Sequence, residues 1–249
     1  MEIKRRPLQG LINIIRFNWH FYLWILCILL VLSLLKSQLP ETLQSITSAC
    51  ILAGEGMLLI SLLTSLYIYD LSDLYQIKWI ENINNKSVLN IHAGFDETSN
   101  LIINKFPQAK LSICDFYDAK KHTEISIQRA RKIYTPHPTT ISVQTHDLPF
   151  PANYFDQSFT ILSAHEIRNP EERIQFFIEL RRITRGKIFV TEHLRDFKNF
   201  LGFSIGAFHF HSRKTWIRTF RASDLAVKRE MKTTPFITTF ELEKNGNSY

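Results

Sequence analysis

The sequence predicts an α/β protein built on a doubly wound, mostly parallel seven-stranded sheet with an antiparallel C-terminal hairpin, preceded by two transmembrane helices. Three observations predict it: two long apolar runs stand near the N-terminus, short β-rich runs alternate with amphipathic stretches beyond residue 86, and two strand-like runs close the chain. We therefore divide the 249 residues into a basic N-terminus (1–16), a transmembrane hairpin (17–69), a juxtamembrane linker (70–86) and an α/β domain (87–249).

The two apolar runs are long enough to span a membrane. Phe17 to Leu35 has 19 residues without Asp, Glu, Lys or Arg, and Thr42 to Tyr69 has 28 with only Glu55 among those types. At about 1.5 Å per helical residue, each run crosses the roughly 30 Å of a hydrocarbon core. The residues before the first run include four basic ones, Lys4, Arg5, Arg6 and Arg16. The loop between the runs has only Lys36, so the positive-inside rule places the N-terminus and the α/β domain in the cytoplasm, at a bacterial-type inner (plasma) membrane.

Two features of these runs have a second interpretation. A cationic start before an apolar run is also typical of a signal peptide, but this run is long, no clear small-residue cleavage site follows, and a second apolar run comes next. Glu55 lies in the middle of the second run, where a carboxylate is costly. It either contacts a polar group of a membrane substrate or another helix, or, as we favour, is a neutral Glu in a small-residue helix contact around residues 53–56. A homodimer through the hairpin is left open.

The linker and the α/β domain follow in order. Residues 71–85 are expected to form a helix along the membrane surface, because Trp79 and Ile80 stand among polar residues. The expected strands are Ser87–Ile91, Leu111–Cys114, Ile141–Gln144, Ser158–Leu162, Lys187–Thr191, Val227–Lys232 and Phe236–Glu243. The expected helices are Glu97–Lys105, Thr123–Lys132, Pro170–Thr184 and Lys214–Ala222. In the third of these helices, Pro170 suits the first turn and Gly186 is expected to stop the helix.

Ligands of a doubly wound sheet bind at the carboxyl ends of its strands, so the turns that follow the strands are where a site is expected. These turns read "SVLNIHAGFDETSNLI", "LSICDFYD", "DLPFPANYFDQSFTILSAHEI" and "EERIQFFIELRRITRGKIFVTEHLRD". Their order resembles class I S-adenosylmethionine-dependent methyltransferases of the small-molecule, ubiquinone/menaquinone-methylase-like type, over roughly residues 86 to 195. The resemblance is strongest in "LPFP" and "FD", followed by "ELRRITRG" and "TEH". It implies a Rossmann-like fold and S-adenosyl-L-methionine as the cofactor.

The resemblance also implies a cofactor loop after the first strand. In the family, an acidic residue is followed by three alternating glycines, and the matching positions here are Asn90, His92, Gly94 and Asp96, so only the middle glycine remains. The altered loop is compatible with a lost cofactor site, but we favour a variant site. In that site Asp96 supplies the negative charge that Asn90 lacks.

Three more cofactor residues are implied. Asp115 follows the second strand, 21 positions after Gly94, close to the separation at which an acid accepts hydrogen bonds from ribose hydroxyls. Its other interpretation is a helix cap or a solvated loop residue. Gln144 and Thr145 match the region in which the family cradles adenine.

Candidate catalytic residues stand after the fourth and fifth strands, where a base would assist transfer to a hydroxyl, phenol or enolisable carbon. They are His165 and Glu166 after the fourth strand, and Glu192 and His193 after the fifth. We rank His165 first and His193 second. Each is equally compatible with a capping role or with a hydrogen-bonded core position.

The segment after His193 is unusually aromatic. Between Asn199 and Phe210 it is rich in Phe, and it is expected to enter the membrane interface or to line a channel for a lipophilic substrate. His209 and His211 alternate and are expected to face one side of an extended segment. With His193 or Glu192 they would suit a transition metal. The spacing is not diagnostic, so we assign no metal and expect both to line the acceptor pocket or its membrane-facing rim.

Composition excludes several classes of protein. Three widely spaced cysteines exclude a disulfide framework and a Cys-based zinc site, and favour a reducing compartment. Residues 87–249 carry 23 Lys and Arg against 17 Asp and Glu, and four of the basic residues, Arg213, Lys214, Arg218 and Arg221, are close together. No nucleic-acid-binding motif accompanies them, so we expect no nucleic acid and take anionic membrane lipid as the partner of this charge.

The sequence thus predicts a membrane-anchored methyltransferase that acts on a lipophilic small molecule, such as a quinone-like, polyene or aromatic lipid, at the cytoplasmic face. The altered glycine loop motivates a second hypothesis, a non-catalytic membrane scaffold that keeps the fold. A third is a membrane-tethered nicotinamide-dependent oxidoreductase, which shares the glycine loop and the ribose-binding acid. The "LPFP" and "FD" stretch and the terminal strand hairpin favour methyl transfer.

Overall fold

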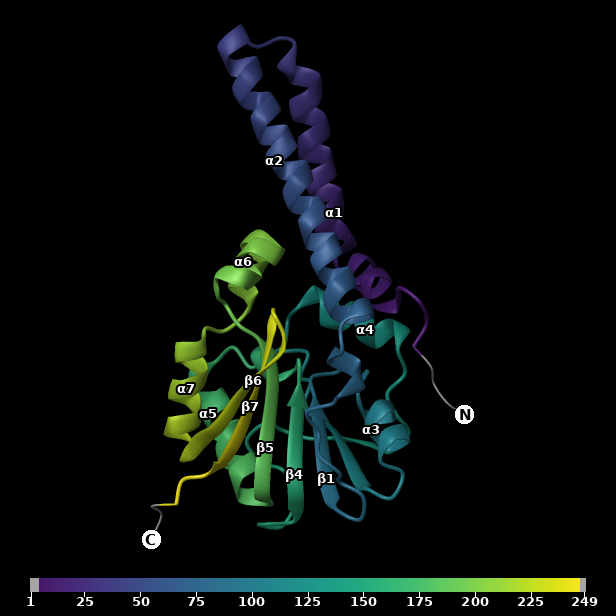
Figure 1. Cartoon of the computed structure of the whole chain (residues 1–249), viewed down its shortest axis with the longest axis vertical. Helices are drawn as coiled ribbons and strands as arrows, with labels where there is room; N and C mark the ends of the chain where they lie inside the picture. Colours follow the sequence, from purple (N-terminus) through teal and green to yellow (C-terminus); the bar gives the residue numbers. More distant parts are fainter. Residues whose placement is uncertain (1–4, 247–249) are drawn as a thin grey trace.

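Two long helices rise from an α/β domain in the computed structural model, which describes residues 5–246 (Figure 1). Helices α1 (Gln9–Lys36) and α2 (Glu41–Leu66) form an antiparallel hairpin. Both are long and apolar enough to cross a membrane, and 0% of the apolar window of each helix is buried inside the protein. A helix from the core of a soluble protein would be mostly buried, so the hairpin is not part of the domain's core.

The α/β domain is a seven-stranded sheet of order β3-β2-β1-β4-β5-β7-β6. Its strands are β1 (Ser87–His92), β2 (Lys110–Asp115), β3 (Thr140–Ser142), β4 (Phe155–Ile161), β5 (Thr184–His193), β6 (Leu225–Thr234) and β7 (Ile237–Lys244). The first five strands are parallel, and β7 is antiparallel to both of its neighbours. The predicted fold class is therefore confirmed, and each expected strand overlaps an observed one.

Helices and aromatic side chains cover both faces of this sheet. Helices α3 (Ser99–Lys105), α5 (Pro170–Ile183) and α7 (Arg213–Ala222) pack against the sheet, whereas α4 (Ile125–Ile133) lies against α1 and α6 (Phe197–Phe203) lies against α2. Phe177 of α5 and Trp216 of α7 belong to the apolar layer that contains Leu89, whereas Ile102 of α3 belongs to the layer that contains Val88. Val88 and Leu89 are neighbours on one strand, so the two layers lie on opposite faces.

Helix α5 begins as predicted but ends differently. The Asn169 side chain accepts a hydrogen bond of 2.8 Å from the Glu172 N–H, and Pro170 occupies the first turn. The helix ends at Ile183 and β5 starts at once, so the expectation that Gly186 stops the helix is wrong. Gly186 lies within β5, where a Cβ would meet the Asp156 carbonyl oxygen at 2.3 Å. Its role is to allow close pairing of β4 with β5.

The segment before the domain also departs from expectation. Residues 71–85 do not form a surface helix: they contain only a short turn, η2 (Leu74–Gln76), after the π-helical turn η1 (Tyr67–Leu71). Ile77, Ile80 and Ile83 are buried in the layer that contains Val88, and Trp79 packs against Phe159 and Phe189. The hydrophobic effect therefore draws this linker onto the sheet instead of leaving it at a membrane surface.

The base of the hairpin is fixed to the domain at the start of α1. The Asp70 carboxylate accepts hydrogen bonds from the N–H groups of Gly10 (2.9 Å) and Leu11 (2.8 Å), so it caps that helix end. Gly10 lies against Tyr69, because a Cβ at Gly10 would be 2.3 Å from the Tyr69 Cβ. A glycine is therefore required where the chain crosses itself.

Glu97 makes the second set of contacts at this base. Its carboxylate accepts hydrogen bonds from Arg5 (2.9 Å), Gln9 (3.1 Å) and the Tyr75 hydroxyl (2.7 Å). Glu97 follows the altered glycine loop, so that loop is joined directly to the hairpin.

Glu55 does not sit in the helix contact that we favoured. Gly54 faces α1, since a Cβ there would be 2.9 Å from a Leu29 methyl carbon, whereas nothing lies within 4 Å of a Cβ built at Gly56. Glu55 itself is exposed on the outside of the hairpin. The small-residue contact within the hairpin therefore involves Gly54 and leaves the carboxylate facing outward.

Candidate functional site

The carboxyl ends of the parallel strands point toward the base of the hairpin (Figure 1). This edge carries the altered glycine loop after β1, Asp115 at the end of β2, the turn η3 (Ala164–Glu166) after β4, and His193 at the end of β5. These are the turns in which the sequence predicts a site. The structure brings the predicted residues to one edge, and their side chains fall into separate groups.

In the glycine loop, Gly94 has φ +88°, a left-handed conformation that favours glycine. His92 is buried, its Nδ1 accepts a hydrogen bond of 3.2 Å from the Gly94 N–H, and its Nε2 has no hydrogen-bond partner among the described residues. Burial lowers the pKa of His92 and outweighs the opposite effect of Asp96 and Asp115, so the ring is neutral. Its Nε2–H is a buried donor available to a ligand.

Asp96 and Asn90 have structural partners. Asp96 Oδ1 accepts hydrogen bonds of 2.9 Å from the N–H groups of Thr98 and Ser99, at the start of α3. The Asn90 amide donates to the hydroxyls of the same two residues, at 2.9 and 2.8 Å, and its Oδ1 is buried without a hydrogen-bond partner among the described residues. The charge of Asp96 therefore lies beside the loop, with Oδ2 3.9 Å from His92 Nε2.

Asp115 is paired with a residue that sequence reasoning missed, Arg131 of α4. Arg131 Nη1 contacts Asp115 Oδ2, the guanidinium lies 4.4 Å from the Tyr117 ring centroid, and Asp115 Oδ1 accepts a hydrogen bond of 2.9 Å from the Tyr117 N–H. A Cβ built at Gly94 would be 2.7 Å from Arg131 Nη1. The Arg131 side chain thus covers both Gly94 and the ribose-binding candidate. No sequence signal pointed to it, since it is one of several basic residues on a short helix.

Gln144 and Thr145 lie at the edge of this group. The Thr145 hydroxyl donates to Glu172 Oε1 at 2.5 Å, so it ties the loop after β3 to the start of α5. Gln144 is exposed and pairs through its backbone with Asp147. The adenine-binding role that the resemblance implies for these two residues stays a prediction.

His165, Glu166 and Glu192 form a second group, buried after β4 and β5. His165 Nδ1 lies 2.6 Å from Glu192 Oε2, and His165 Nε2 lies 3.2 Å from Glu166 Oε1. Glu192 is 0% exposed, and its other oxygen accepts hydrogen bonds from the N–H groups of Ser163 (3.1 Å) and His165 (3.2 Å). The imidazole is therefore held between two carboxylates.

This environment determines the protonation of the group. Burial acts to lower the pKa of His165, but the charge of Glu192 and the hydrogen bonds with both carboxylates outweigh it and raise that pKa to about 10. Burial acts to raise the pKa of Glu166, yet its hydrogen bonds with His165 and His209 hold that pKa well below its usual range. His165 is therefore protonated at neutral pH, and in this state it is not a proton acceptor.

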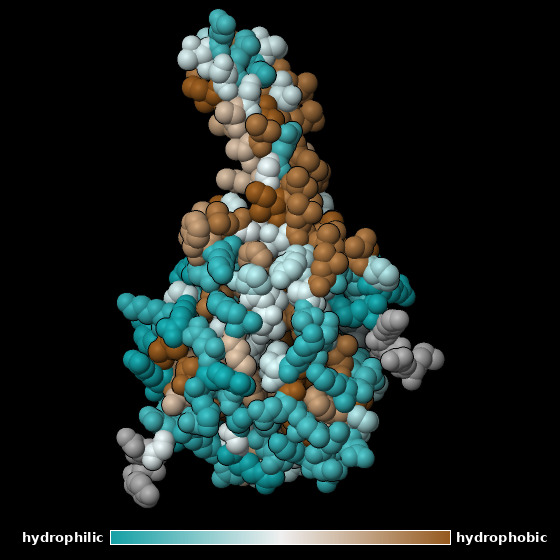
Figure 2. All heavy atoms as spheres, in the orientation of Figure 1, coloured by the Kyte–Doolittle hydropathy of each residue, from teal (hydrophilic) through white to brown (hydrophobic). Residues whose placement is uncertain are grey.

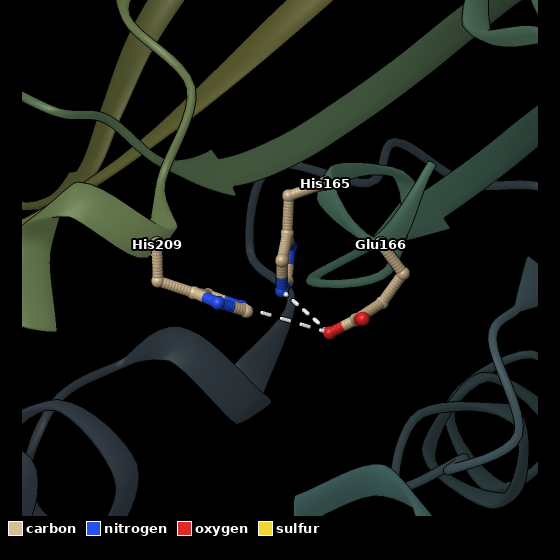
Figure 3. A group of neighbouring side chains, drawn as sticks. All are labelled: His165, Glu166 and His209. Atoms are coloured by element: carbon tan, nitrogen blue, oxygen red, sulfur yellow. Dashed lines mark ion pairs between the residues drawn. The ribbon is translucent and has the colours of Figure 1, made fainter. Parts of the chain in front are cut away.

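His209 and Glu124 complete this second group. Both histidines point toward Glu166 (Figure 3), and His209 Nε2 lies 3.7 Å from Glu166 Oε1. His209 ends the turn η4 (Ser204–His209), and its Nδ1 lies 3.3 Å from Oε1 of Glu124, which precedes α4. His211 does not share this surface, because its Nε2 lies 3.0 Å from Arg173 Nη1 and its ring packs on Trp216. The expectation that the two histidines face one side is wrong, since the turn at His209 breaks the alternation.

His193 lies in a third environment. Its Nε2 is 2.9 Å from the Tyr69 hydroxyl, its Nδ1 is 3.0 Å from Asn199 Oδ1, and its ring stacks on Phe210 at 4.5 Å. Burial lowers the pKa of His193 to about 4. His193 is thus neutral, and both of its ring nitrogens are already paired.

An apolar rim stands beside the hairpin base, formed by α6 and η4. The side chains of the rim are exposed: Phe197, Phe200, Leu201, Ile205 and Phe208. Gly202 lies against α2, since a Cβ there would be 2.8 Å from Thr64 Cγ2. Figure 2 shows apolar side chains gathered at the hairpin base, above a hydrophilic body.

The comparisons with known proteins agree with this fold. No protein family model matches the chain, and no curated protein matches it. The chain is similar to a SAM-dependent methyltransferase from Aquifex aeolicus at 13% identity and a TM-score of 0.50, over 75% of this chain and 97% of that chain. It is also similar to the PH0226 protein from Pyrococcus horikoshii OT3, at 16% identity and a TM-score of 0.49, over 69% of this chain and 85% of that chain. A third similar structure is geranyl diphosphate C-methyltransferase from Streptomyces coelicolor A3(2), at 12% identity and a TM-score of 0.47, over 69% of this chain and 77% of that chain. At these identities the likeness to the Aquifex protein shows the fold alone, and that fold is the class I methyltransferase fold.

Proposed function

We propose that this protein is a membrane-anchored S-adenosylmethionine-dependent methyltransferase that acts on a lipophilic small molecule at the cytoplasmic face of the membrane. One observation carries the proposal. The strand ends at which a methyltransferase fold binds cofactor and acceptor lie directly at the base of an exposed apolar hairpin. A quinone-like, polyene or aromatic lipid that partitions into the bilayer would reach such an edge by lateral diffusion.

The exposure of the hairpin supports membrane anchoring. Trp24, Leu34 and Leu52 are 68%, 64% and 71% exposed, and such a surface is stable in hydrocarbon but not in water. A cleaved signal sequence fits poorly, because the Tyr134 hydroxyl donates to Asn13 of α1 at 2.8 Å and Arg129 donates to the Phe17 carbonyl at 2.6 Å. Removal of α1 would break these contacts with the domain.

The residues present fit the cofactor once Arg131 moves. Adenosylmethionine needs an acceptor for its ribose hydroxyls, which Asp115 offers, and close approach to a backbone, which Gly94 offers with φ +88°. His92 Nε2–H and Asn90 Oδ1, both buried without hydrogen-bond partners among the described residues, are further polar atoms for a ligand. The Arg131 side chain is 33% exposed, so it can leave Asp115 for solvent. The bound cofactor supplies the activated methyl group.

The chain's own contribution is to orient the acceptor. Methyl transfer requires the nucleophile in line with the methyl, at about 3–3.5 Å. Glu166 Oε2 is buried and has no hydrogen-bond partner among the described residues, so it is the group that remains to accept a hydrogen bond from an acceptor hydroxyl. Protonated His165 holds the Glu166 carboxylate in place through Oε1. His193, with both ring nitrogens hydrogen-bonded, has a structural role beside the site.

Two experiments in sequence test this function. In calorimetric titrations of the full chain in detergent, we expect S-adenosylhomocysteine and S-adenosylmethionine to bind with micromolar affinity. Binding is expected to fall more than tenfold (about 1.4 kcal/mol) in Asp115→Ala and to be unchanged in the exposed control Asp147→Ala. The protein is then supplied with methyl-labelled cofactor and membrane lipid extract, and the label is expected in the lipid fraction. Absence of label from every lipid fraction, with protein that binds cofactor, would contradict the lipophilic acceptor.

A second candidate function has its own observation. Arg131 occupies the space over Gly94 and Asp115, as expected if the site no longer binds cofactor and the domain is a membrane scaffold for a partner. Folded wild-type protein that binds neither compound would favour this scaffold. The nicotinamide-dependent oxidoreductase gains no support, because the antiparallel terminal hairpin that favours methyl transfer is present as β6 and β7.

A further inference from the structure

Two imidazoles and one carboxylate converge at the carboxyl edge of the sheet (Figure 3). The Nε2 atoms of His165 and His209 lie 3.2 and 3.7 Å from Glu166 Oε1, and the potential ligand atoms of the three residues all lie within 4.8 Å of one another. Ligands about 2.0–2.1 Å from a tetrahedral zinc ion are ~3.3 Å apart. The two separations from Glu166 Oε1 are therefore close to those between ligands of one metal ion.

Each imidazole is also supported from behind. His165 Nδ1 lies 2.6 Å from Glu192 Oε2, and His209 Nδ1 lies 3.3 Å from Glu124 Oε1. Metal-binding histidines commonly donate their second ring N–H to a carboxylate, which fixes the tautomer and raises the basicity of the ligand nitrogen. His165 has such a carboxylate in Glu192, and His209 gains one in Glu124 once Arg168, which is 2.6 Å from the same Nδ1, moves away. A cluster of solvated charged side chains would not require a carboxylate behind each imidazole.

Glu166 gives an independent sign of a missing ligand. The residue is 3% exposed, and its Oε2 is buried without a hydrogen-bond partner among the described residues. A buried carboxylate oxygen that lacks a partner costs about 1–3 kcal/mol or more. A cation bound to this carboxylate would satisfy the atom in place of the direct hydrogen bond from an acceptor hydroxyl.

We propose that His165, Glu166 and His209 form a binding site for a divalent transition metal of the zinc class. Two imidazoles and a carboxylate suit Zn²⁺, Co²⁺ or Fe²⁺, whereas Mg²⁺ and Ca²⁺ prefer oxygen ligands alone. Three protein ligands leave a fourth position open, as in catalytic zinc sites. The role of that position rests on the proposed function: it would hold an oxygen of the methyl acceptor and lower the pKa of its hydroxyl.

Arg168 is the group that a metal must displace. Its Nη2 lies 2.6 Å from Nδ1 and 2.9 Å from Nε2 of His209, and 3.6 Å from Glu124 Oε1. The Arg168 side chain is 37% exposed, so it can turn from the imidazole toward Glu124 or solvent. Metal binding then exchanges one positive neighbour of His209 for another, and it displaces the Nε2 proton through which His165 holds Glu166 in the metal-free protein.

The test measures metal binding, without cofactor or acceptor. Full-length protein, freed of any histidine tag and treated with a chelator, is dialysed in detergent against Co²⁺ or Zn²⁺, and bound metal is quantified together with the Co²⁺ absorption spectrum. We expect one ion per chain, with Co²⁺ bands of four- or five-coordinate geometry. Failure of methyl transfer would leave this result intact, so the two proposals are tested separately.

Three variants assign the ligands. His209→Gln, at a partly exposed position, and Glu166→Gln are each expected to weaken Co²⁺ binding more than tenfold, whereas His146→Gln, at an exposed histidine outside the cluster, is expected to bind as wild type. Glu192→Gln is expected to lower the Co²⁺ affinity about 10–100-fold, because Glu192 supports the ring of His165. Folded wild-type protein that binds neither ion, or a His209→Gln variant with unchanged affinity and spectrum, would overturn the proposal.

Discussion

The hydroxyl of Tyr69 lies 2.9 Å from Nε2 of His193, and this contact joins the turn η1, which follows the second hairpin helix, to the end of β5. The Asn199 amide nitrogen donates to the Phe236 carbonyl, so its oxygen faces His193 Nδ1 at 3.0 Å. Nδ1 therefore carries the ring proton and Nε2 accepts from Tyr69. Asn199 thus determines the tautomer of His193, and a residue at the base of the hairpin donates to its other ring nitrogen.

Tyr69→Phe is expected to destabilise the protein by about 1–3 kcal/mol. The substitution leaves His193 Nε2 buried without a donor, and an unsatisfied buried acceptor costs about this much. Denaturant unfolding in detergent measures it, with the half-exposed Tyr154→Phe as control. Equal stability of the two variants would mean that the contact contributes nothing.

Arg131→Met is expected to tighten the binding of S-adenosylhomocysteine. In the structure the guanidinium competes for Asp115. The apparent dissociation constant equals the intrinsic one divided by the fraction of binding-competent protein, so removing the competing conformer lowers it. Calorimetric titration checks this, with Lys132→Met, at an exposed residue of the same helix, as control. Tenfold weaker binding in Arg131→Met would instead make the arginine a cofactor ligand.

Acid is expected to destabilise the folded protein through His193. Because burial lowers the pKa of His193 from 6.5 to about 4, its contribution to stability is complete above pH 6.5 and is lost as the pH falls toward 4. Within this window the free energy of unfolding falls by about 1.4 kcal/mol per pH unit. Unfolding free energies across this window should fall less steeply in His193→Gln. Parallel curves for wild type and variant would show that the pKa of His193 is not lowered in the folded protein.

Gly10→Ala is expected to weaken hairpin docking. The new Cβ would lie 2.3 Å from the Tyr69 Cβ, and such overpacking costs about 1–3 kcal/mol. Gly56→Ala is the matched control, since nothing lies within 4 Å of its Cβ. Thermal unfolding of both variants in detergent gives the comparison. A loss of stability in Gly56→Ala alone would indicate a contact on the outer face of the hairpin.

The apolar rim is expected to enter the membrane interface. Ile205 is 79% exposed, and burying an Ile side chain in hydrocarbon contributes about 1.5–3 kcal/mol. A nitroxide on Ile205→Cys, with Cys27 and Cys50 replaced, should in vesicles be relaxed more by oxygen than by a water-soluble nickel chelate. A label at the exposed Lys214→Cys should behave oppositely. Equal nickel accessibility at the two positions would place the rim in water.

Local patterns in the sequence determined the fold. Alternating apolar residues in the strands, the Asn169 cap with Pro170 in α5, and the long apolar runs of α1 and α2 each depend on neighbours within a few residues. The same patterns placed Asp115, His165 and Glu192 at strand ends, because the carboxyl ends of parallel strands share one edge. Gly186 and the linker of residues 71–85 were mispredicted, because contacts with β4 and with the sheet outweighed local propensity there.

Tertiary structure alone decided which side chains meet at that edge. His165 is 44 residues from His209 along the chain, yet their rings are 5.1 Å apart, whereas His211 turns away to Arg173. Arg131 reaches Asp115, and Tyr69 reaches His193, across elements that no sequence spacing relates. Such contacts arise when the hydrophobic packing of the sheet and helices brings distant segments together, and one sequence carries no local record of that convergence.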